Sequence, residues 1–234
     1  MKLLEGDRAL VTGTGNGIGK GIAAALEAEG AKVMRADLAG SDFDVDLSSA
    51  DGARRLAAEA IRRLGAVSIF VHSASPRRQE SQTVLEATEA QWREMLAVNL
   101  DAAFVLAQAF GKHMVERRTK GKILLVTSLH AESPRRIPHY SAAKAGETML
   151  VKELARALGP QGIRVNAIAP GAIPGGGFQA PPGMVEKIPL RRFGTPADVA
   201  AMAVAVLSER FGAYVTGSTI VVDGGIALYN WIDA

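Results

Sequence analysis

Short apolar runs alternate with amphipathic segments along the whole chain. Short segments in which apolar residues predominate span 9–12, 31–36, 67–71, 122–127, 164–168 and 219–222. Between these runs, apolar positions recur at the three- and four-residue spacing of a helix over 18–28, 50–64, 89–118, 140–158 and 196–207. Such alternation is typical of parallel strands joined by crossover helices. The pattern therefore predicts an α/β fold, with a parallel sheet and helices on both of its faces.

No linker, repeat or shift in composition divides the 234 residues, and a chain of this length suits one large α/β domain. We therefore predict a single domain over 1–234. A stretch rich in Gly and Pro begins near Gly171. Because loops vary the chemistry of a constant scaffold, we expect a substrate loop over about 172–189.

Composition narrows the class of protein. Hydrophobic residues make up 48% of the chain and charged residues 22%, as in ordinary globular proteins. Cysteine is absent, which excludes disulfides and thiolate chemistry and fits a reducing compartment, so we expect a cytoplasmic protein. Glu5, Asp7 and Arg8 interrupt the opening segment, and no apolar run approaches the roughly 20 residues of a membrane helix, so neither export nor a membrane partner is expected.

Charge and histidine positions argue against two further classes. The net charge is only +3, and aromatic residues, which stack on bases, are 5% of the chain, so no nucleic-acid partner is expected. The four histidines, at 72, 113, 130 and 139, show no metal-ligand spacing, and no metal site is predicted.

A glycine-rich segment, TGTGNGIG at 12–19, follows the first predicted strand and opens the first predicted helix. Glycines let the backbone approach a pyrophosphate, and the first amides of a helix offer it unsatisfied donors. We predict a dinucleotide site that contains Gly13, Asn16, Gly17, Ile18 and Gly19. Taken alone, the segment could equally be a glycine-rich turn.

Asp37 ends the second predicted strand. A carboxylate at this point can accept hydrogen bonds from the adenosine ribose and would repel a 2′-phosphate, so we predict NAD, with NADP less favoured. Two alternatives stay open: Asp37 could cap a turn, and nearby Arg35 could assist a phosphate.

Tyr140 and Lys144, in the segment YSAAK, are four residues apart and therefore share one side of the predicted helix. A cation one turn from a phenol favours the phenolate, which makes Tyr140 a usable acid or base. The same spacing also occurs in ordinary surface pairs.

Six motifs in order resemble those of the short-chain dehydrogenases/reductases across almost the whole chain. They are TGTGNGIG, VNL with Asn99, LLVTS with Ser128, YSAAK, RVNAIAPG at 164–171 and VTGSTIVVDGG at 215–225. The resemblance implies a single-domain, doubly wound Rossmann-type sheet of about seven parallel strands.

The resemblance also implies roles for residues. Tyr140 would be the acid/base, Lys144 would hold the nicotinamide ribose, Ser128 would orient the substrate oxygen and Asn99 would hold a water in a proton relay. Further cofactor contacts are expected at Asp46 and Leu47 near the adenine, and at Ser73, Ala74, Pro170, Gly171 and Ile173.

The chain departs from the family pattern at three places. HSAS at 72–75 stands where NNAG is usual, which predicts either strain at Ser75 or a different local path. The interval from Ser128 to Tyr140 is short, which leaves Thr127 and Ser133 as alternatives for the serine role. Gly175 stands where the family often has a cofactor-contacting Thr.

The function expected from these residues is NAD(H)-dependent interconversion of a secondary alcohol and a ketone. Alternatives are a 3-oxoacyl-carrier-protein reductase and a catalytically silent NAD sensor. A small-molecule substrate is expected, and a homotetramer could bury apolar residues near 100–110 and 226–231. Arginine doublets at 77/78, 135/136 and 191/192 are predicted to converge on the mouth of the site, which would favour an anionic substrate.

Overall fold

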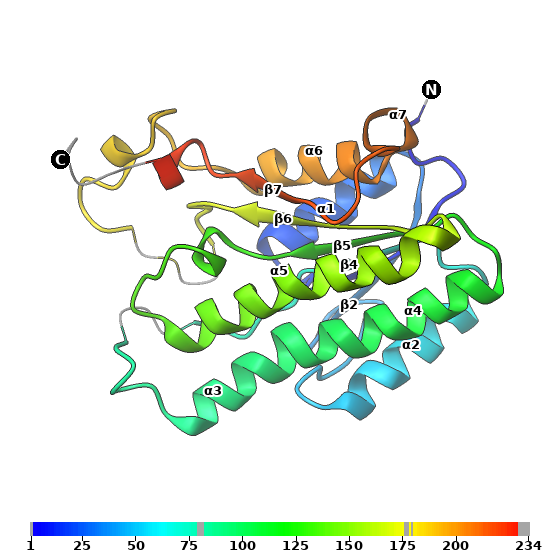
Figure 1. Cartoon of the computed structure of the whole chain (residues 1–234), viewed down its shortest axis with the longest axis horizontal. Helices are drawn as coiled ribbons and strands as arrows, with labels where there is room; N and C mark the ends of the chain where they lie inside the picture. The colour runs from blue at the N-terminus through cyan, green and yellow to red at the C-terminus, as the bar shows by residue number, and fades with distance from the viewer. Residues whose placement is uncertain (1, 79–81, 176–177, 179, 229–234) are drawn as a thin grey trace.

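Seven parallel strands form one sheet in the computed structural model, which describes residues 2–78, 82–175, 178 and 180–228 (Figure 1). The spatial order is β3-β2-β1-β4-β5-β6-β7. In chain order, the strands are β1 (Arg8–Thr12), β2 (Lys32–Asp37), β3 (Phe43–Asp44), β4 (Ile69–His72), β5 (Lys122–Val126), β6 (Arg164–Pro170) and β7 (Thr219–Val222). The order reverses between β1 and β4, and in doubly wound sheets ligands bind outside the carboxyl ends of the strands at such a point.

Helices cover both faces of the sheet (Figure 1). They are α1 (Gly17–Ala28), α2 (Ala50–Leu64), α3 (Glu89–Leu96), α4 (Ala102–Glu116), α5 (Pro138–Leu158), α6 (Pro196–Leu207) and α7 (Glu209–Gly212). One buried cluster joins the sheet to α1 and α6, and a second joins it to α2, α4 and α5. Both faces of the central strands are therefore covered, and every residue of β5 and β6 is buried, including Lys122, Arg164 and Asn166.

Local signals explain where several helices begin. Ser49 accepts a hydrogen bond from the Gly52 amide at the start of α2, and Thr88 and Thr195 form capping boxes at α3 and α6. The predicted elements over 50–64, 196–207 and 219–222 match the observed ones residue for residue, and the other predicted strands and helices shift by one or two residues at their ends. The predicted fold is confirmed.

The long helix predicted over about 89–118 is continuous over Glu89–Glu116, but it is not regular throughout. It is α3, a π-helical turn at Ala97–Asp101 and α4. By length and composition alone, Glu89–Glu116 could cross a membrane, but α4 packs on α2 and lines the core beneath the sheet. Two short elements, β3 and α7, were not predicted. They have two and four residues, which is too short for a pattern of apolar positions to be recognised.

Candidate active site

Two adjoining cavities lie along the carboxyl ends of the strands, with volumes of about 600 and 540 Å³. The larger is lined by most of the predicted site: Gly13, Asn16, Gly17, Ile18, Gly19, Asp37, Ser73, Ser128, Tyr140, Lys144, Pro170, Gly171 and Ile173. The smaller is lined by Asp46, Leu47 and Ala74, and it shares Gly13 and Asp37 with the larger. The fold therefore brings every predicted cofactor residue to one continuous, elongated site.

The glycine turn is shaped by close backbone contacts. Gly13 has a φ of +73°, and a Cβ there would lie 2.7 Å from backbone atoms of Ser73 and Ala74. A Cβ at Gly19 would lie 2.1 Å from the Gly13 carbonyl oxygen. At the start of α1, the Asn16 side chain makes no capping hydrogen bond, so it does not occupy the first amides of the helix. This turn fits a pyrophosphate, because it leaves room and backbone donors where a side chain would otherwise stand.

Asp37 lies between the two cavities. Its carboxylate accepts hydrogen bonds from the Gly15 amide at 2.8 Å and the Leu38 amide at 2.7 Å, so it faces the glycine turn. Arg35, the alternative phosphate ligand, instead forms a 2.7 Å ion pair with Glu27 on α1. Each Asp37 oxygen keeps a lone pair for a ribose hydroxyl, which fits the predicted cofactor.

Tyr140 and Lys144 lie on one side of α5 and line the larger cavity. The Lys144 ammonium is 5.7 Å from the centre of the Tyr140 ring and donates to the Val126 carbonyl at 2.8 Å. It also contacts both carboxylate oxygens of Glu147, at 2.9 and 3.1 Å. Burial raises the pKa of the Glu147 carboxyl to about 7, against the lowering effect of Lys144. Sequence reasoning missed Glu147, although its position three residues after Lys144 was a usable signal.

Ser128 follows β5 and lies in the same cavity as Tyr140. Its hydroxyl oxygen accepts from the His130 amide at 3.1 Å, which leaves the hydroxyl proton for donation. The Thr127 hydroxyl donates its proton to the Ile168 carbonyl at 3.0 Å. Ser133 is exposed and does not line the cavity. Of the three candidates, Ser128 has the geometry to orient a substrate oxygen.

Asn99 is the one predicted catalytic residue that lines neither cavity. It lies in the π-helical turn, fully buried, and its amide nitrogen donates to the Met95 carbonyl at 2.9 Å. Within the described part of the chain, its amide oxygen has no hydrogen-bond partner. Single π-helical turns are frequent at functional sites, but the water-relay role of Asn99 stays a prediction.

His72, the last residue of β4, takes the place of the usual first Asn and connects three segments. Its Nδ1 is 3.0 Å from the Thr12 hydroxyl and its Nε2 is 3.0 Å from the Val98 carbonyl oxygen. Because a carbonyl only accepts, Nε2 donates, and Nδ1 accepts from Thr12, whose oxygen in turn accepts from the Ser73 and Ala74 amides. Burial, with a smaller effect of Lys144, lowers the pKa of His72 to about 3. The neutral imidazole of His72 therefore connects the end of β1 to the π-helical turn through its hydrogen bonds with Thr12 and Val98.

Known proteins are similar over nearly the whole chain. The family model described as Enoyl-(Acyl carrier protein) reductase matches residues 13–227. Glucose 1-dehydrogenase 2 of Bacillus subtilis (strain 168) is 33% identical over 253 residues and 97% of each chain. The 2-dehydro-3-deoxy-D-gluconate 5-dehydrogenase of Escherichia coli (strain K12) is 30% identical over 245 residues, which cover 95% of this chain and 96% of that protein.

A solved structure agrees. It is described as a candidate short-chain alcohol dehydrogenase from Sinorhizobium meliloti 1021, with a TM-score of 0.90 and 30% identity over 97% of this chain and 98% of that chain. This chain belongs to the short-chain dehydrogenase/reductase family. It is accordingly an oxidoreductase that acts on CH–OH groups with a nicotinamide cofactor and a small-molecule substrate. This result disfavours the catalytically silent sensor.

Because Ser75 stands where the family has a glycine, the sequence left two alternatives open, a strained backbone at Ser75 or a different local path. Non-glycine residues with positive φ in the described chain are Arg118, Arg136 and Arg191, and Ser75 is not among them. The local backbone therefore follows a path that any residue can adopt, and the strain alternative is wrong.

The predicted convergence of three arginine doublets on this dehydrogenase's cavity is only partly right. Arg77 and Arg78 line it, and the Arg78 guanidinium lies 4.7 Å from the centre of the Tyr140 ring. The doublets at 135/136 and 191/192 are not in its lining, and Arg192 is paired with Asp198 at 2.7 Å. No cluster of three or more metal-binding side chains occurs among the residues that the structure describes.

Proposed function

We propose that this dehydrogenase interconverts a secondary alcohol and a ketone with NAD(H), using Tyr140 as the acid/base. The observation that carries the proposal is the convergence of Tyr140, Ser128 and Lys144 on the cavity that holds the glycine turn. When bound, the nicotinamide supplies the hydride chemistry, accepting a hydride from the carbinol carbon or returning it to the ketone. In oxidation the hydroxyl proton passes to the Tyr140 phenolate, and in reduction the phenol returns it.

Ser128 and Lys144 support that proton transfer. The free hydroxyl proton of Ser128 donates to the substrate oxygen as negative charge develops there. The Lys144 ammonium, close to the Tyr140 ring, stabilises the phenolate and would hold the nicotinamide ribose. Asp37 supports NAD over NADP, because a second negative charge on the ribose would meet its carboxylate.

The direct test is cofactor binding followed by turnover. We expect tryptophan fluorescence to report saturable binding of NADH and weaker binding of NADPH. A panel of secondary alcohols and sugar alcohols should then yield NADH, measured by its absorbance. Binding of NADPH in preference to NADH would overturn the cofactor assignment, and it would favour the alternative of a 3-oxoacyl-carrier-protein reductase.

We further propose that the substrate carries an anionic group. The support is Arg78, whose guanidinium stacks on the Tyr140 ring at the mouth of the cavity, next to Arg77. A relative named for a sugar acid, the Escherichia coli enzyme, uses a carboxylate-bearing substrate by its name. Guanidinium groups bind carboxylates and phosphates through paired hydrogen bonds.

Matched ketones with and without a carboxylate test this step. We expect catalytic efficiency to be higher for the charged ketone at low salt, and changing both Arg77 and Arg78 to Ala should remove most of that advantage. The matched control changes the exposed doublet Arg54 and Arg55 on α2. Equal efficiency for both ketones in all three proteins would rule the anionic subsite out.

A homotetramer is proposed on exposed apolar side chains. Phe104 on α4 and Met149 on α5 are 46% and 55% exposed, and Val221 on β7 is 55% exposed. Such surface on neighbouring helices and an edge strand is typical of an interface between copies. Part of the segment predicted to contribute, 229–231, lies outside the described residues. Light scattering should give four times the chain mass, and a monomeric mass would refute the assembly.

A further inference from the structure

Three buried polar side chains follow one face of α5. Tyr140, Lys144 and Glu147 occupy positions i, i+4 and i+7, and they are 7%, 2% and 0% exposed. Glu147 lies behind Lys144 as seen from the cavity, because it does not line the cavity whereas Lys144 and Tyr140 do. An acidic residue therefore stands directly behind the two groups on which the proposed chemistry depends.

Glu147 occupies most of the hydrogen-bonding capacity of Lys144. An ammonium has three donors. Lys144 contacts three acceptors, namely the Val126 carbonyl at 2.8 Å and the two Glu147 oxygens at 2.9 and 3.1 Å. Lys144 can therefore bind a ribose hydroxyl only by sharing or releasing one of these contacts, so Glu147 determines where the ammonium stands.

Glu147 also changes the charge that reaches Tyr140. A lone buried ammonium near a phenol would favour the phenolate, but an adjacent carboxylate opposes that effect in a low-dielectric interior. The other groups near the pair and Tyr140 are His72 on β4, which burial keeps neutral near pH 7, and Arg78, whose guanidinium lies 4.7 Å from the centre of the Tyr140 ring. Neither replaces the negative charge of Glu147.

We propose that Glu147 is a positioning residue that holds Lys144 and attenuates the positive charge acting on Tyr140. The inference rests on the proposed roles of Tyr140 and Lys144, and it adds a fourth group that adjusts them. A purely structural role is a poor explanation, because both partners sit on one helix and buried ion pairs contribute little net stability over apolar residues.

Protonation of Glu147 gives the arrangement a pH dependence. Burial raises its carboxyl pKa to about 7, so the carboxylate is lost as the pH falls through neutrality. Lys144 is then released toward the cavity with its charge unopposed. The wild-type pH profile should therefore contain an ionisation near neutrality that belongs to Glu147 and not to the substrate.

The first test needs no cofactor. The chain has three tyrosines, and Tyr214 is fully exposed, so ultraviolet titration of the phenolate signal can isolate Tyr140 by subtraction of a Tyr140→Phe trace. In Glu147→Gln, which keeps size and loses charge, we expect the Tyr140 midpoint to move to lower pH by about one unit. The control is Glu153→Gln, the same change at an exposed position of α5, which should match wild type.

A second variant separates charge from packing. Glu147→Asp keeps the charge and shortens the side chain, so its midpoint should stay close to that of wild type. A packing role predicts the reverse, with Asp more disruptive than Gln. No shift in Glu147→Gln, or a shift to higher pH, would overturn the inference.

The pH profile of alcohol oxidation then separates the two proposals. In Glu147→Gln, we expect the rise in oxidation rate that follows deprotonation of Tyr140 to move to lower pH, as the phenol midpoint does. The ionisation near neutrality should disappear from the profile. A shifted phenol midpoint without turnover of any alcohol would sustain the role of Glu147 and refute the proposed reaction. Normal turnover with an unshifted midpoint would do the opposite.

Discussion

Two lysine–carboxylate pairs, each with a buried lysine, lie at opposite ends of β5. At the amino end, Lys122 contacts both oxygens of Asp7 at 3.0 and 3.1 Å. At the carboxyl end, Lys144 binds the last carbonyl of the strand, at Val126, and pairs with Glu147. The two pairs have the same chemistry and nearly the same geometry, but they connect different parts of the chain.

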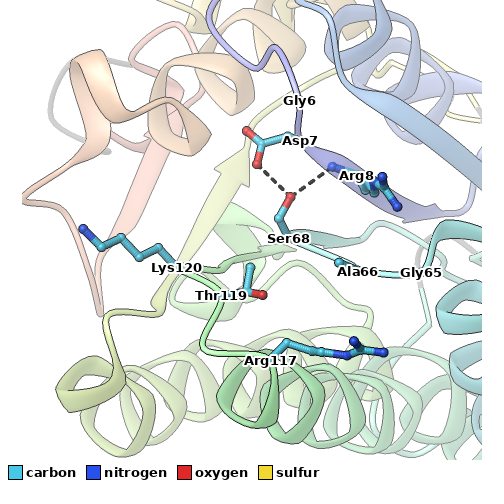
Figure 2. A pocket seen from close by; sticks show the side chains of 9 residues that line it. All are labelled: Gly6, Asp7, Arg8, Gly65, Ala66, Ser68, Arg117, Thr119 and Lys120. Carbon is cyan, nitrogen blue, oxygen red and sulfur yellow. Dashed lines mark hydrogen bonds between the residues drawn. The ribbon is translucent and has the colours of Figure 1, made fainter.

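The amino-end pair joins distant segments. Asp7 also accepts a hydrogen bond from Ser68 at 2.7 Å, and Ser68 accepts from the Arg8 amide, which connects the starts of β1 and β4 (Figure 2). Lys122 adds the start of β5 through its contacts with Asp7. The adjoining cavity of about 530 Å³ is open, and its lining includes Arg117 and Lys120. By contrast, Lys144 and Glu147 are three residues apart on one helix. The first pair links segments that are far apart in the sequence and so stabilises the fold, whereas the second positions the Lys144 side chain at the cavity.

The largest expected effect is on turnover, which should depend on the carboxyl end of β5 and not on its amino end. Tyr140→Phe removes the transferable proton but no packing, so turnover should fall by about 100-fold or more. NADH binding, measured by fluorescence, and the free energy of unfolding should stay close to those of wild type. Wild-type turnover in this variant would remove Tyr140 from the mechanism.

The next effect is on the free energy of unfolding, which should depend on the pair at the amino end of β5. Asp7→Ala leaves Lys122 buried without its close partner, which should cost about 3 kcal/mol in the free energy of unfolding. Activity per folded molecule should be unchanged, because the pair lies at the amino ends of the strands, whereas Tyr140 lies at their carboxyl ends. Denaturant titration with parallel assays checks both statements, and a loss of turnover without a loss of stability would contradict the comparison.

The pH dependence of stability sharpens the comparison at the carboxyl end. Burial lowers the pKa of His72 to about 3, so below its ordinary value the unfolded chain takes up a proton that the native chain does not. Stability contributed by neutral His72 is thus present above about pH 6.5 and is lost as the pH falls. Wild type should lose about 1.4 kcal/mol per pH unit relative to His72→Asn between about pH 6 and 4. Glu147 is common to both proteins, so its titration cancels, and parallel unfolding curves at all pH values would refute the assignment.

The smallest effect concerns selectivity. Asp37→Ala should weaken the preference for NADH over NADPH by about tenfold, which corresponds to about 1.4 kcal/mol. Gly15 loses a hydrogen bond in this variant, so thermal unfolding should accompany the binding titrations. An unchanged ratio of the two affinities would show that the carboxylate does not choose the cofactor.

Much of the site was predictable because its parts are local in sequence. TGTGNGIG carries its turn and helix start within eight residues, and Tyr140 and Lys144 are one helical turn apart. The arginine doublets show where such reasoning fails. All three lie in loops, but only the doublet at 77/78 lines the cavity. Arg192 instead pairs with Asp198 at the start of α6, and the direction of a side chain in an irregular loop follows no periodic pattern.

The sequence by itself determined the order of strands and helices, the glycine turn and the Tyr140–Lys144 pair, since each rests on short-range periodicity or spacing. Only the tertiary structure decided that Glu147 and Lys144 are both buried, that Asn99 stands in a π-helical turn apart from the cavity, and that His72 is neutral. The physical reason is burial. A side chain's hydrogen-bond partners and charge state depend on which distant segments exclude water from it, and no local pattern contains that information.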